Sequence, residues 1–274
     1  MSLEQCFYIS RVSYESNNWI NNLLEKEFNI SDNLEKKIDD ILINDIRNYL
    51  LKKKNKFNLN IKINFDRGLP NMAVFDLEDD LIISFCGLTS KLDAINCLNC
   101  LLTYNNELDC FVHKGFNNIL KIIVDEIELI LDIKNKKNVV FTGHSLGGAI
   151  SKILCLYFNK YKSKNYSCIT FASPMVGDQS FGDNFNKYVK KTLNFICKDD
   201  YVIQFPIFRK CKEDNCYIIE NGKLCQYKDK NLKCLINPYK WNLESHVMGY
   251  FYQRLIIDKP NLLSIYTKFY CKNE

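Results

Sequence analysis

Apolar and polar residues follow two different periods along this chain. Short β-branched and aromatic runs predict buried strands, and longer stretches with an apolar residue every three or four positions predict helices. The clearest strand followed by a helix begins at Asn138, where the run Val139-Val140-Phe141 predicts a buried strand. A helix is predicted directly after residue 149, because apolar residues recur there at Ile150, Ile153, Leu154, Tyr157 and Phe158.

The same two patterns divide the rest of the chain into alternating elements. Helices are predicted at 14–28, 31–51, from 112–116 to about 131, and at 179–190. Strands are predicted at 59–65, 72–77, 81–86, 168–171 and 193–197, with a hairpin turn at 78–80 and a short amphipathic piece at 92–102. Strands that alternate with helices of this length favour an α/β fold with a mostly parallel central sheet and helices on both faces.

The 274 residues fit one large domain, and 47% hydrophobic content is enough for a packed core. Since no linker, low-complexity tract or internal repeat divides the chain, we expect a single domain over 1–274, of which 1–55 is a helical N-terminal part.

The charge pattern excludes a dedicated nucleic-acid binder. The net charge is +5, but almost all of the basic residues are lysines, and bidentate recognition of phosphate or guanine favours arginine. The arginines are Arg11, Arg47, Arg67, Arg209 and Arg254. A mild attraction to anionic membrane surfaces remains compatible with this charge.

Neither a signal peptide nor an apolar run long enough to span a membrane is recognisable, so a soluble, cytoplasmic protein is expected. In that compartment most of the 13 cysteines should be reduced thiols, many of them buried as small hydrophobic residues. Cys97 and Cys100 have the spacing of half a zinc or redox site, but no second pair at metal-site spacing accompanies them. No metal or organic cofactor is expected.

The predicted strand and helix around Ser145 enclose the motif Gly143-x-Ser145-x-Gly147. A serine on a tight strand-to-helix turn exposes its hydroxyl, and small residues two positions on either side allow the strand and helix to approach closely. This context is typical of the nucleophile elbow of α/β-hydrolases.

A serine nucleophile needs an imidazole base and a carboxylate that orients it, and in this fold they follow the serine in the order acid, then histidine. The chain has three histidines: His113 precedes the serine, and His144 is on the elbow, where it is expected to point away from its neighbour. His246 alone lies downstream, and it is therefore the predicted base.

The acid should follow a strand near the elbow, at the carboxyl edge of the sheet. Asp199 and Asp200 follow the predicted strand 193–197 directly, whereas Asp178 follows a turn and is a weaker candidate. The remaining downstream carboxylates are Asp183, Glu213, Asp214, Glu220, Asp229 and Glu244.

Several further segments resemble the class 3 (fungal-type) lipases, which include related phospholipases A1 and feruloyl esterases. The resemblance covers about residues 70 to 255 and lies in 82–87, 112–116, 140–149, 170–178, 200–202 with Pro206, and His246 with Tyr250. It implies an α/β-hydrolase fold with Ser145 as nucleophile, Asp200 as acid and His246 as base. It also implies that His113 has a packing or hydrogen-bonding role.

For the oxyanion hole, the residue after the nucleophile supplies one backbone N–H, that of Leu146. The resemblance implies a second from Leu88. The family usually has Arg-Gly followed by Ser or Thr, whereas this chain has Cys86-Gly87-Leu88, so a side-chain hydroxyl and an arginine that anchors the loop are missing unless Thr89 replaces the hydroxyl. The family also places a lid over about 89–105; a fixed helix packed on the core is the alternative.

The sequence therefore predicts a serine carboxylester hydrolase of lipid esters, of the triacylglycerol lipase or phospholipase A1 type, with possible peripheral contact with a lipid interface. An esterase for small soluble esters and a catalytically inactive hydrolase fold used as a binding module remain as alternatives. The stretch 208–240 resembles no known motif and is expected to form the loops ahead of His246.

Overall fold

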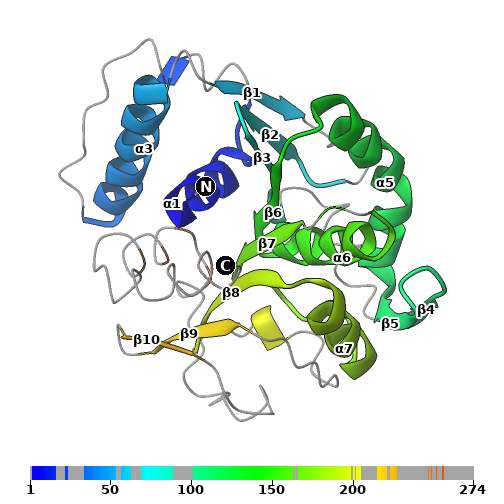
Figure 1. The fold of residues 1–274 in the computed structure, drawn as a ribbon. Helices are drawn as coiled ribbons and strands as arrows, with labels where there is room; N and C mark the ends of the chain where they lie inside the picture. The colour runs from blue at the N-terminus through cyan, green and yellow to red at the C-terminus, as the bar shows by residue number, and fades with distance from the viewer. Residues whose placement is uncertain are drawn as a thin grey trace.

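The computed structural model describes residues 2–16, 22–23, 34–53, 57–62, 69–88, 101–162, 164, 166–198, 200, 202–204, 215–220, 223–226, 246, 248, 251 and 255. Within them, one eight-stranded sheet has the order β1-β2-β3-β6-β7-β8-β9-β10 (Figure 1). Its strands are β1 (Phe57–Lys62), β2 (Met72–Leu77), β3 (Asp80–Phe85), β6 (Asn138–His144), β7 (Ser167–Phe171), β8 (Lys191–Cys197), β9 (Cys216–Glu220) and β10 (Lys223–Gln226).

The centre of this sheet is parallel and its two edges are antiparallel. β3, β6, β7, β8 and β9 pair in parallel, whereas β1 with β2, β2 with β3, and β9 with β10 are antiparallel. The predicted mostly parallel central sheet is therefore confirmed, as is the hairpin between β2 and β3, with residues 78–79 in its bend.

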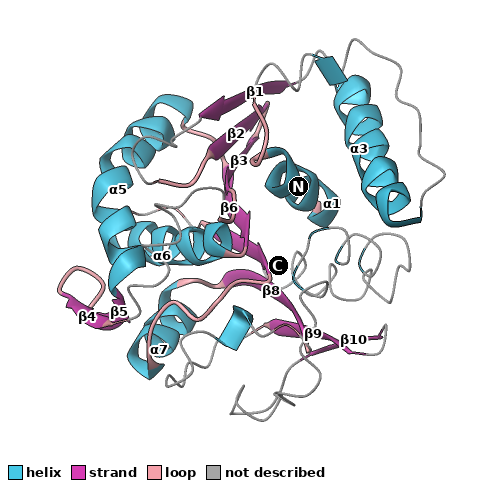
Figure 2. Cartoon of the chain, turned by 180° about the vertical axis from the view of Figure 1, so that it is seen from behind, coloured by secondary structure: helices cyan, strands magenta, loops and turns pink. Residues whose placement is uncertain are grey.

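Helices cover both faces of the sheet. α1 (Leu3–Val12) and α3 (Leu34–Lys53) lie on one side, and α5 (Lys114–Lys134), α6 (Leu146–Tyr161) and α7 (Gln179–Tyr188) lie on the other (Figures 1 and 2). Because successive side chains of a strand point to opposite faces, each strand contributes to two separate apolar clusters. In β6, for example, Val140 belongs to the cluster with α1 and Phe141 to the cluster with α6.

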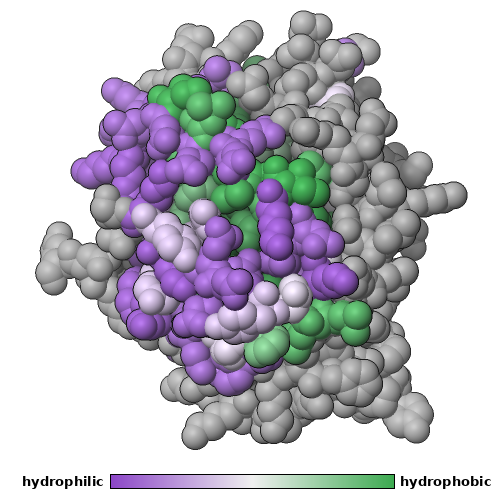
Figure 3. Space-filling view, turned by 90° about the vertical axis from the view of Figure 1, so that its right-hand side faces the viewer, coloured by the Kyte–Doolittle hydropathy of each residue, from purple (hydrophilic) through white to green (hydrophobic). Residues whose placement is uncertain are grey.

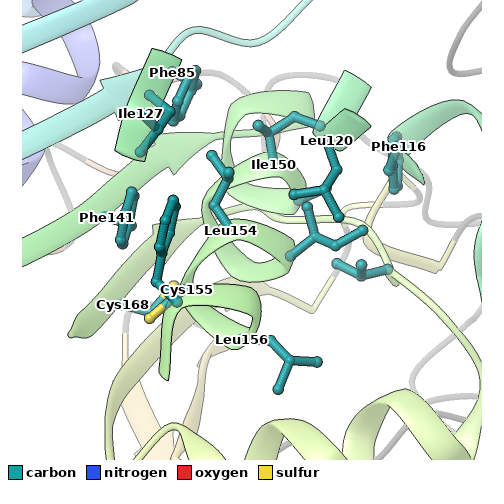
Figure 4. Packing of buried hydrophobic residues seen from close by; sticks show 14 of the residues in the cluster. Phe85, Phe116, Leu120, Ile127, Phe141, Ile150, Leu154, Cys155, Leu156 and Cys168 are labelled. Atoms are coloured by element: carbon teal, nitrogen blue, oxygen red, sulfur yellow. The ribbon is translucent and has the colours of Figure 1, made fainter. Parts of the chain in front are cut away.

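The cluster around α6 is the denser support of the site. Ile150 and Leu154 of α6 pack with Leu120 and Ile127 of α5 and with Phe141 of β6 (Figure 4). Since α6 is buried along most of its length, the turn that leads into it is held from both sides.

A second, two-stranded sheet precedes α5. β4 (Leu102–Asn105) and β5 (Cys110–His113) form an antiparallel hairpin, and β5 also bridges from Val112 to Gly177. The predicted amphipathic piece at 92–102 and most of the predicted lid lie outside the described residues. The part of that range that the structure describes, 101–105, is this exposed strand and its lead-in.

Two stretches differ from the prediction. The helix α1 at Leu3–Val12 was not predicted; of the helix predicted at 14–28, the structure describes 14–16, which follow α1 as a turn and bend, and 22–23, which are helical. Buried residues lie all around α1, so it lacks the one-sided period that predicts a helix. The stretch 208–240, expected to form loops, contains β9 and β10, which extend the sheet beyond β8.

Of the eight cysteines in the described part of the chain, seven are buried. Figure 4 shows two of them, Cys155 of α6 and Cys168 of β7, side by side within the apolar cluster. Burial raises the pKa of the Cys155 thiol, with the neighbouring Cys168 adding to the effect. These cysteines therefore act as small core residues. Cys97 and Cys100 lie outside the described residues.

On the side of the molecule that carries α5 and α7, hydrophilic residues predominate and the hydrophobic ones form separate patches (Figure 3). In the described part of the chain, no helix combines the length and the apolar character needed to cross a membrane.

Candidate active site

Ser145 occupies the turn between β6 and α6. Its backbone has φ 54° and ψ −125°, a conformation that side-chain-bearing residues rarely adopt. The Ser145 N–H donates to the carbonyl of Phe171 at the end of β7, at 3.0 Å. The strained turn is thereby fixed to the neighbouring parallel strand, and it is the elbow that the motif predicts.

Two glycines allow this turn to form. A Cβ on Gly147 would lie 1.9 Å from the carbonyl oxygen of Phe85 in β3, and a Cβ on Gly143 would lie 2.4 Å from the carbonyl carbon of Gly147. Both contacts are with backbone atoms, which cannot rotate away as a side chain can. Glycine is therefore required at both positions by the close approach of β3, β6 and α6.

The three residues of the predicted triad meet at this elbow. Ser145 Oγ lies 2.8 Å from Nε2 of His246, and Nδ1 of His246 lies 2.7 Å from Oδ2 of Asp200. The serine and histidine are slightly exposed, with 9% of Ser145 and 14% of the His246 side chain accessible, and Asp200 is fully buried. Residues 46 and 101 positions apart thus form one hydrogen-bonded chain.

Asp200 is held in place at the carboxyl end of β8. Its backbone N–H donates to the carbonyl of Cys197, and its second oxygen, Oδ1, accepts from the N–H of Val202 at 2.9 Å. Val202 begins the short 3₁₀ helix η2 (Val202–Gln204). Both carboxylate oxygens are therefore occupied, and Oδ2 points to the imidazole.

The other described acid candidates have structural positions. Asp178 caps the N-terminus of α7 by accepting from the N–H of Ser180, Asp183 accepts from Gln179 on the same helix, and Glu220 ends β9. The rest of the candidates, Asp199, Glu213, Asp214, Asp229 and Glu244, lie outside the described residues.

The partners of His246 determine which of its nitrogens carries the proton. A buried carboxylate accepts hydrogen bonds, so Nδ1 of a neutral His246 donates to Asp200. Nε2 is then free to accept the hydroxyl proton of Ser145. This is the tautomer that a general base for the serine requires.

The loop that should supply the second oxyanion donor lies against the nucleophile. A Cβ on Gly87 would be 3.1 Å from Cβ of Ser145, which places this loop beside the serine. Cys86 is anchored by Asn71: its N–H donates to the Asn71 carbonyl at 3.0 Å, and its sulfur accepts from the Asn71 N–H at 3.2 Å. These two bonds continue the pairing of β2 with β3 and hold the start of the oxyanion loop to the residue before β2.

The two residues predicted to line the oxyanion hole differ in their surroundings. Leu146 is the first residue of α6, where a backbone N–H has no acceptor within its own helix. The side chain of Leu88 is 50% exposed next to Gly87. Thr89 lies outside the described residues.

Two further polar side chains are linked to His246, and the sequence predicted a role for neither of them. His144 lies between Tyr14 and His246: its Nδ1 is 2.7 Å from the Tyr14 hydroxyl and its Nε2 is 2.6 Å from the main-chain oxygen of His246. Burial and the neighbouring His246 lower the pKa of His144 to about 3. The 130 residues between Tyr14 and His144 explain why no local pattern relates them.

The third histidine has a structural role, as the resemblance implies. His113 is buried at the N-cap of α5, where Nδ1 accepts from the N–H of Gly115, and its ring stacks on Phe116 at 3.9 Å between centroids. Over the described residues, no group of three or more His, Cys, Asp or Glu side chains is arranged to hold a metal ion.

A mostly parallel sheet, with a serine on a strained turn between a strand and a buried helix and with a histidine and an aspartate hydrogen-bonded behind it, defines the α/β-hydrolase class. Residues 82–210 match the model of the family "Lipase (class 3)", which confirms the predicted resemblance over that stretch. The matched stretch contains Ser145 and Asp200 and ends before His246.

The chain is also similar to individual known proteins. The chain is similar to "Protein EDS1B" from Arabidopsis thaliana, with 25% identity over 142 residues, or 46% of this chain and 22% of that protein. It is also similar to "Senescence-associated carboxylesterase 101" from the same plant, with 30% identity over 104 residues, or 34% of this chain and 19% of that protein. The chain thus spans about a fifth of the length of these relatives. The structure of a fungal lipase in complex with an inhibitor superposes with a TM-score of 0.66 at 16% identity, covering 89% of this chain and 92% of the lipase.

Proposed function

We propose that this chain is a serine carboxylester hydrolase that cleaves lipid esters, of the triacylglycerol lipase or phospholipase A1 type. The observation that carries the proposal is the hydrogen-bonded chain from Ser145 through His246 to the buried Asp200. The match to the class 3 lipase model over 82–210 supports the lipid ester as substrate.

In the proposed mechanism, Ser145 Oγ attacks the ester carbonyl as Nε2 of His246 takes up the hydroxyl proton. The imidazolium that forms is stabilised by the carboxylate of Asp200. His246 then donates this proton to the departing alcohol, which leaves an acyl group on Ser145. A water molecule, deprotonated by His246, then attacks the acyl carbon; the bond to Ser145 Oγ breaks, His246 returns the proton to Oγ, and the fatty acid is released.

The tetrahedral intermediates carry a negative oxygen, which needs hydrogen-bond donors fixed in advance. We assign this role to the backbone N–H groups of Leu146 and Leu88, each contributing about 3 kcal/mol to the transition state. The contact between Gly87 and Ser145 supports the assignment of Leu88. The mechanism uses no metal or organic cofactor.

A lipid substrate is also supported by apolar side chains on the described surface. Apolar side chains that are exposed to solvent occur at Leu88 in the oxyanion loop and at Leu101 and Leu102 at the start of β4. Side chains of this kind favour contact with an apolar phase. We therefore include peripheral contact with a lipid interface in the proposal.

Release of p-nitrophenol from its butyrate and palmitate esters tests this function. We expect a burst of about one equivalent followed by a slower steady state, and loss of both in Ser145→Ala. A folded wild-type protein that releases product from neither ester contradicts the proposal, as does a Ser145→Ala variant with full activity.

The palmitate-to-butyrate ratio separates a lipase from an esterase for small soluble esters. A lipid hydrolase prefers palmitate and accelerates when the substrate forms micelles. A rate that favours butyrate and does not change at the micelle concentration indicates the esterase.

An inactive hydrolase fold used as a binding module is the second candidate, because Leu88 stands where class 3 lipases usually have a hydroxyl residue. A fluorophosphonate probe distinguishes the two, since it labels a serine only if its base and oxyanion donors are functional. Labelling of wild type but not of Ser145→Ala rules the binding module out, and an unlabelled wild type supports it.

A further inference from the structure

We propose that Tyr14 and His144 are positioning residues, which hold the oxyanion loop, the elbow and the main chain of His246 in one hydrogen-bonded chain. The expected effect on kcat rests on the function proposed above, whereas the expected protonation and protection of the histidine rings do not. Neither residue faces the reacting atoms. Both act through the groups to which they bind.

The chain of contacts begins at the oxyanion loop. A Cβ on Gly87 would lie 2.3 Å from the Tyr14 hydroxyl oxygen, so the phenol fills the space that the missing side chain leaves. The Tyr14 hydroxyl is thus packed directly against the Gly87 backbone. The hydroxyl lies 2.7 Å from Nδ1 of His144, and Nε2 of His144 lies 2.6 Å from the carbonyl oxygen of His246.

The carbonyl oxygen at the end of this series of contacts determines which atom carries each proton in the series. The carbonyl oxygen of His246 can only accept, so Nε2 of His144 carries a hydrogen. His144 is neutral, because burial and the adjacent His246 lower its pKa, so Nδ1 has no hydrogen and accepts from Tyr14. Burial likewise raises the pKa of Tyr14, so its hydroxyl remains a donor.

Because His144 is neutral, it does not oppose the positive charge that His246 acquires as the base. The rings of His144 and His246 lie 4.9 Å apart, and a charge on His144 would oppose the imidazolium that forms on His246 during the reaction. The titratable side chains that face His144 among the described residues are Tyr14 and His246, and Cys86 and Arg11 act in turn on Tyr14. None of them places a negative charge against His144; the hydrogen bond to the His246 carbonyl favours protonation of His144, but burial, the largest effect on its pKa, outweighs it.

These contacts give the base a second connection to the nucleophile. Ser145 and His144 are adjacent in sequence, so His246 is bound to this dipeptide through its ring by Ser145 and through its main chain by His144. Tyr14 extends the connection to α1, which is itself joined to β6 by the contact of 3.0 Å between the hydroxyls of Ser10 and Thr142. The placement of the base therefore depends on the docking of the N-terminal helix.

Steady-state kinetics on a p-nitrophenyl ester test the kinetic consequence. In Tyr14→Phe and His144→Leu we expect kcat to fall roughly 10- to 100-fold with KM changed by less than about threefold, because misplacement of the base by a fraction of an ångström affects the chemical step more than binding. His144→Gln should recover most of the lost kcat, since its amide N–H can replace Nε2–H of the imidazole. Tyr8→Phe, on a buried tyrosine of α1, the helix that precedes Tyr14, is the matched control.

If Tyr14 and His144 only stabilised the fold, their substitution would lower the amount of folded protein, and folded His144→Gln and His144→Leu would have the same kcat. Equal kcat in wild type and in a folded His144→Leu variant overturns the kinetic consequence, as does equal loss in the Gln and Leu variants. Ser145→Ala, measured in parallel, establishes that the activity belongs to this site.

Nitrogen NMR of the histidine rings tests the structural consequence without any activity. The chain contains three histidines, so each ring can be assigned by substitution. We expect His144 to remain the neutral Nε2–H tautomer from pH 8 to pH 5, and the His246 Nδ1 proton to be protected from exchange by Asp200. In His144→Leu this protection should fall at least tenfold, and in His113→Asn it should be unchanged.

The ester assays and the NMR measurement distinguish failure of the proposed function from failure of the positioning role. If wild-type protein hydrolyses no ester while the histidine ring signals behave as expected, the proposed function is wrong, but the positioning role of Tyr14 and His144 is supported. If the His246 Nδ1 proton is equally protected in wild type and His144→Leu, or if His144 titrates between pH 8 and pH 5, the proposed positioning role of Tyr14 and His144 is wrong, whatever the activity.

Discussion

At the scale of single residues, the elbow combines a strained serine with glycines that leave no room for a side chain. Ser145 has a positive φ, and the backbone of β3 lies within 1.9 Å of where a Cβ on Gly147 would be. The sequence motif predicted both features, because a G-x-S-x-G turn needs them wherever it occurs. The stability of the elbow should therefore respond sharply to the smallest possible added group.

We predict that Gly147→Ala lowers the free energy of unfolding by about 3 kcal/mol or more, because the added methyl would overlap backbone atoms of Phe85 and Cys86. Urea unfolding followed by circular dichroism measures this. Gly148→Ala is the matched comparison and should cost less, since its closest contact, 2.8 Å, is with the Ser173 side chain. A Gly147→Ala protein as stable as wild type would contradict the packing of the elbow described here.

Buried His144 also makes stability depend on pH. Its pKa falls from an ordinary value of 6.5 to about 3 in the folded chain, so between these values the unfolded chain takes up a proton that the folded chain does not. The contribution of His144 to stability is thus fully present above pH 6.5 and is lost as the pH falls toward 3. The slope is up to about 1.4 kcal/mol per pH unit.

We predict that wild type loses about 2 kcal/mol more stability than His144→Gln between pH 6.5 and pH 5, because glutamine does not titrate. Urea midpoints at four pH values in this range measure the difference. Tyr8→Phe, which leaves the His144 environment in place, should keep the wild-type slope. Parallel stability curves for wild type and His144→Gln would show that His144 titrates normally in the folded protein.

At the scale of elements, the sequence predicted what local periodicity can encode. The strands β2 and β8 and the helices α5, α6 and α7 have clear apolar patterns, and they were predicted to within a few residues. α1 was missed because it is buried around most of its circumference. Its start nevertheless had a signal: Ser2 followed by Gln5 is a capping box, in which each side chain binds the backbone N–H of the other.

The position of His246 next to Ser145 was predictable because the fold imposes an order on these residues and one histidine follows Ser145 in the chain, whereas the choice of Asp200 over Asp199 came from the family resemblance. No such order rule exists for Tyr14 and His144, whose contact depends on how α1 docks on β6. β9 and β10 were missed because strands of five and four residues in a lysine- and cysteine-rich stretch have too little periodicity. Positions fixed by tertiary packing were therefore the ones that the sequence did not predict.

We predict that Ser2→Ala lowers the free energy of unfolding by about 1 kcal/mol, because the capping box of α1 is lost. Ser2→Asp should keep most of that stability, since aspartate also accepts at an N-cap. Urea unfolding of the three proteins measures both effects. If Ser2→Ala and Ser2→Asp lose the same amount, the cap makes no contribution and the turn of Tyr14 depends on packing alone.

At the scale of the whole molecule, the hairpin of β4 and β5 lies at the same edge of the sheet as the elbow. Gly148, in the first turn of α6, contacts Ser173, and four residues later Gly177 bridges to Val112 of β5. The outward side of the hairpin carries Tyr104 and Phe111, whose rings lie edge to face at 5.2 Å and are both exposed. These exposed aromatic rings form an apolar surface on the hairpin.

We predict that replacing Tyr104 and Phe111 together by serine reduces binding to phosphatidylcholine vesicles and hydrolysis of the palmitate ester at least fivefold, with the rate on the soluble butyrate ester within twofold of wild type. The reason is that this pair lies away from the triad and can affect only the contact with the lipid phase. Vesicle sedimentation and the two ester assays measure the three quantities. Replacing Leu129 and Ile133 by serine is the control, because they are equally exposed but lie toward the far end of α5. An equal loss in both double variants, or a loss on butyrate as well, would show that the hairpin is not the surface that meets the lipid.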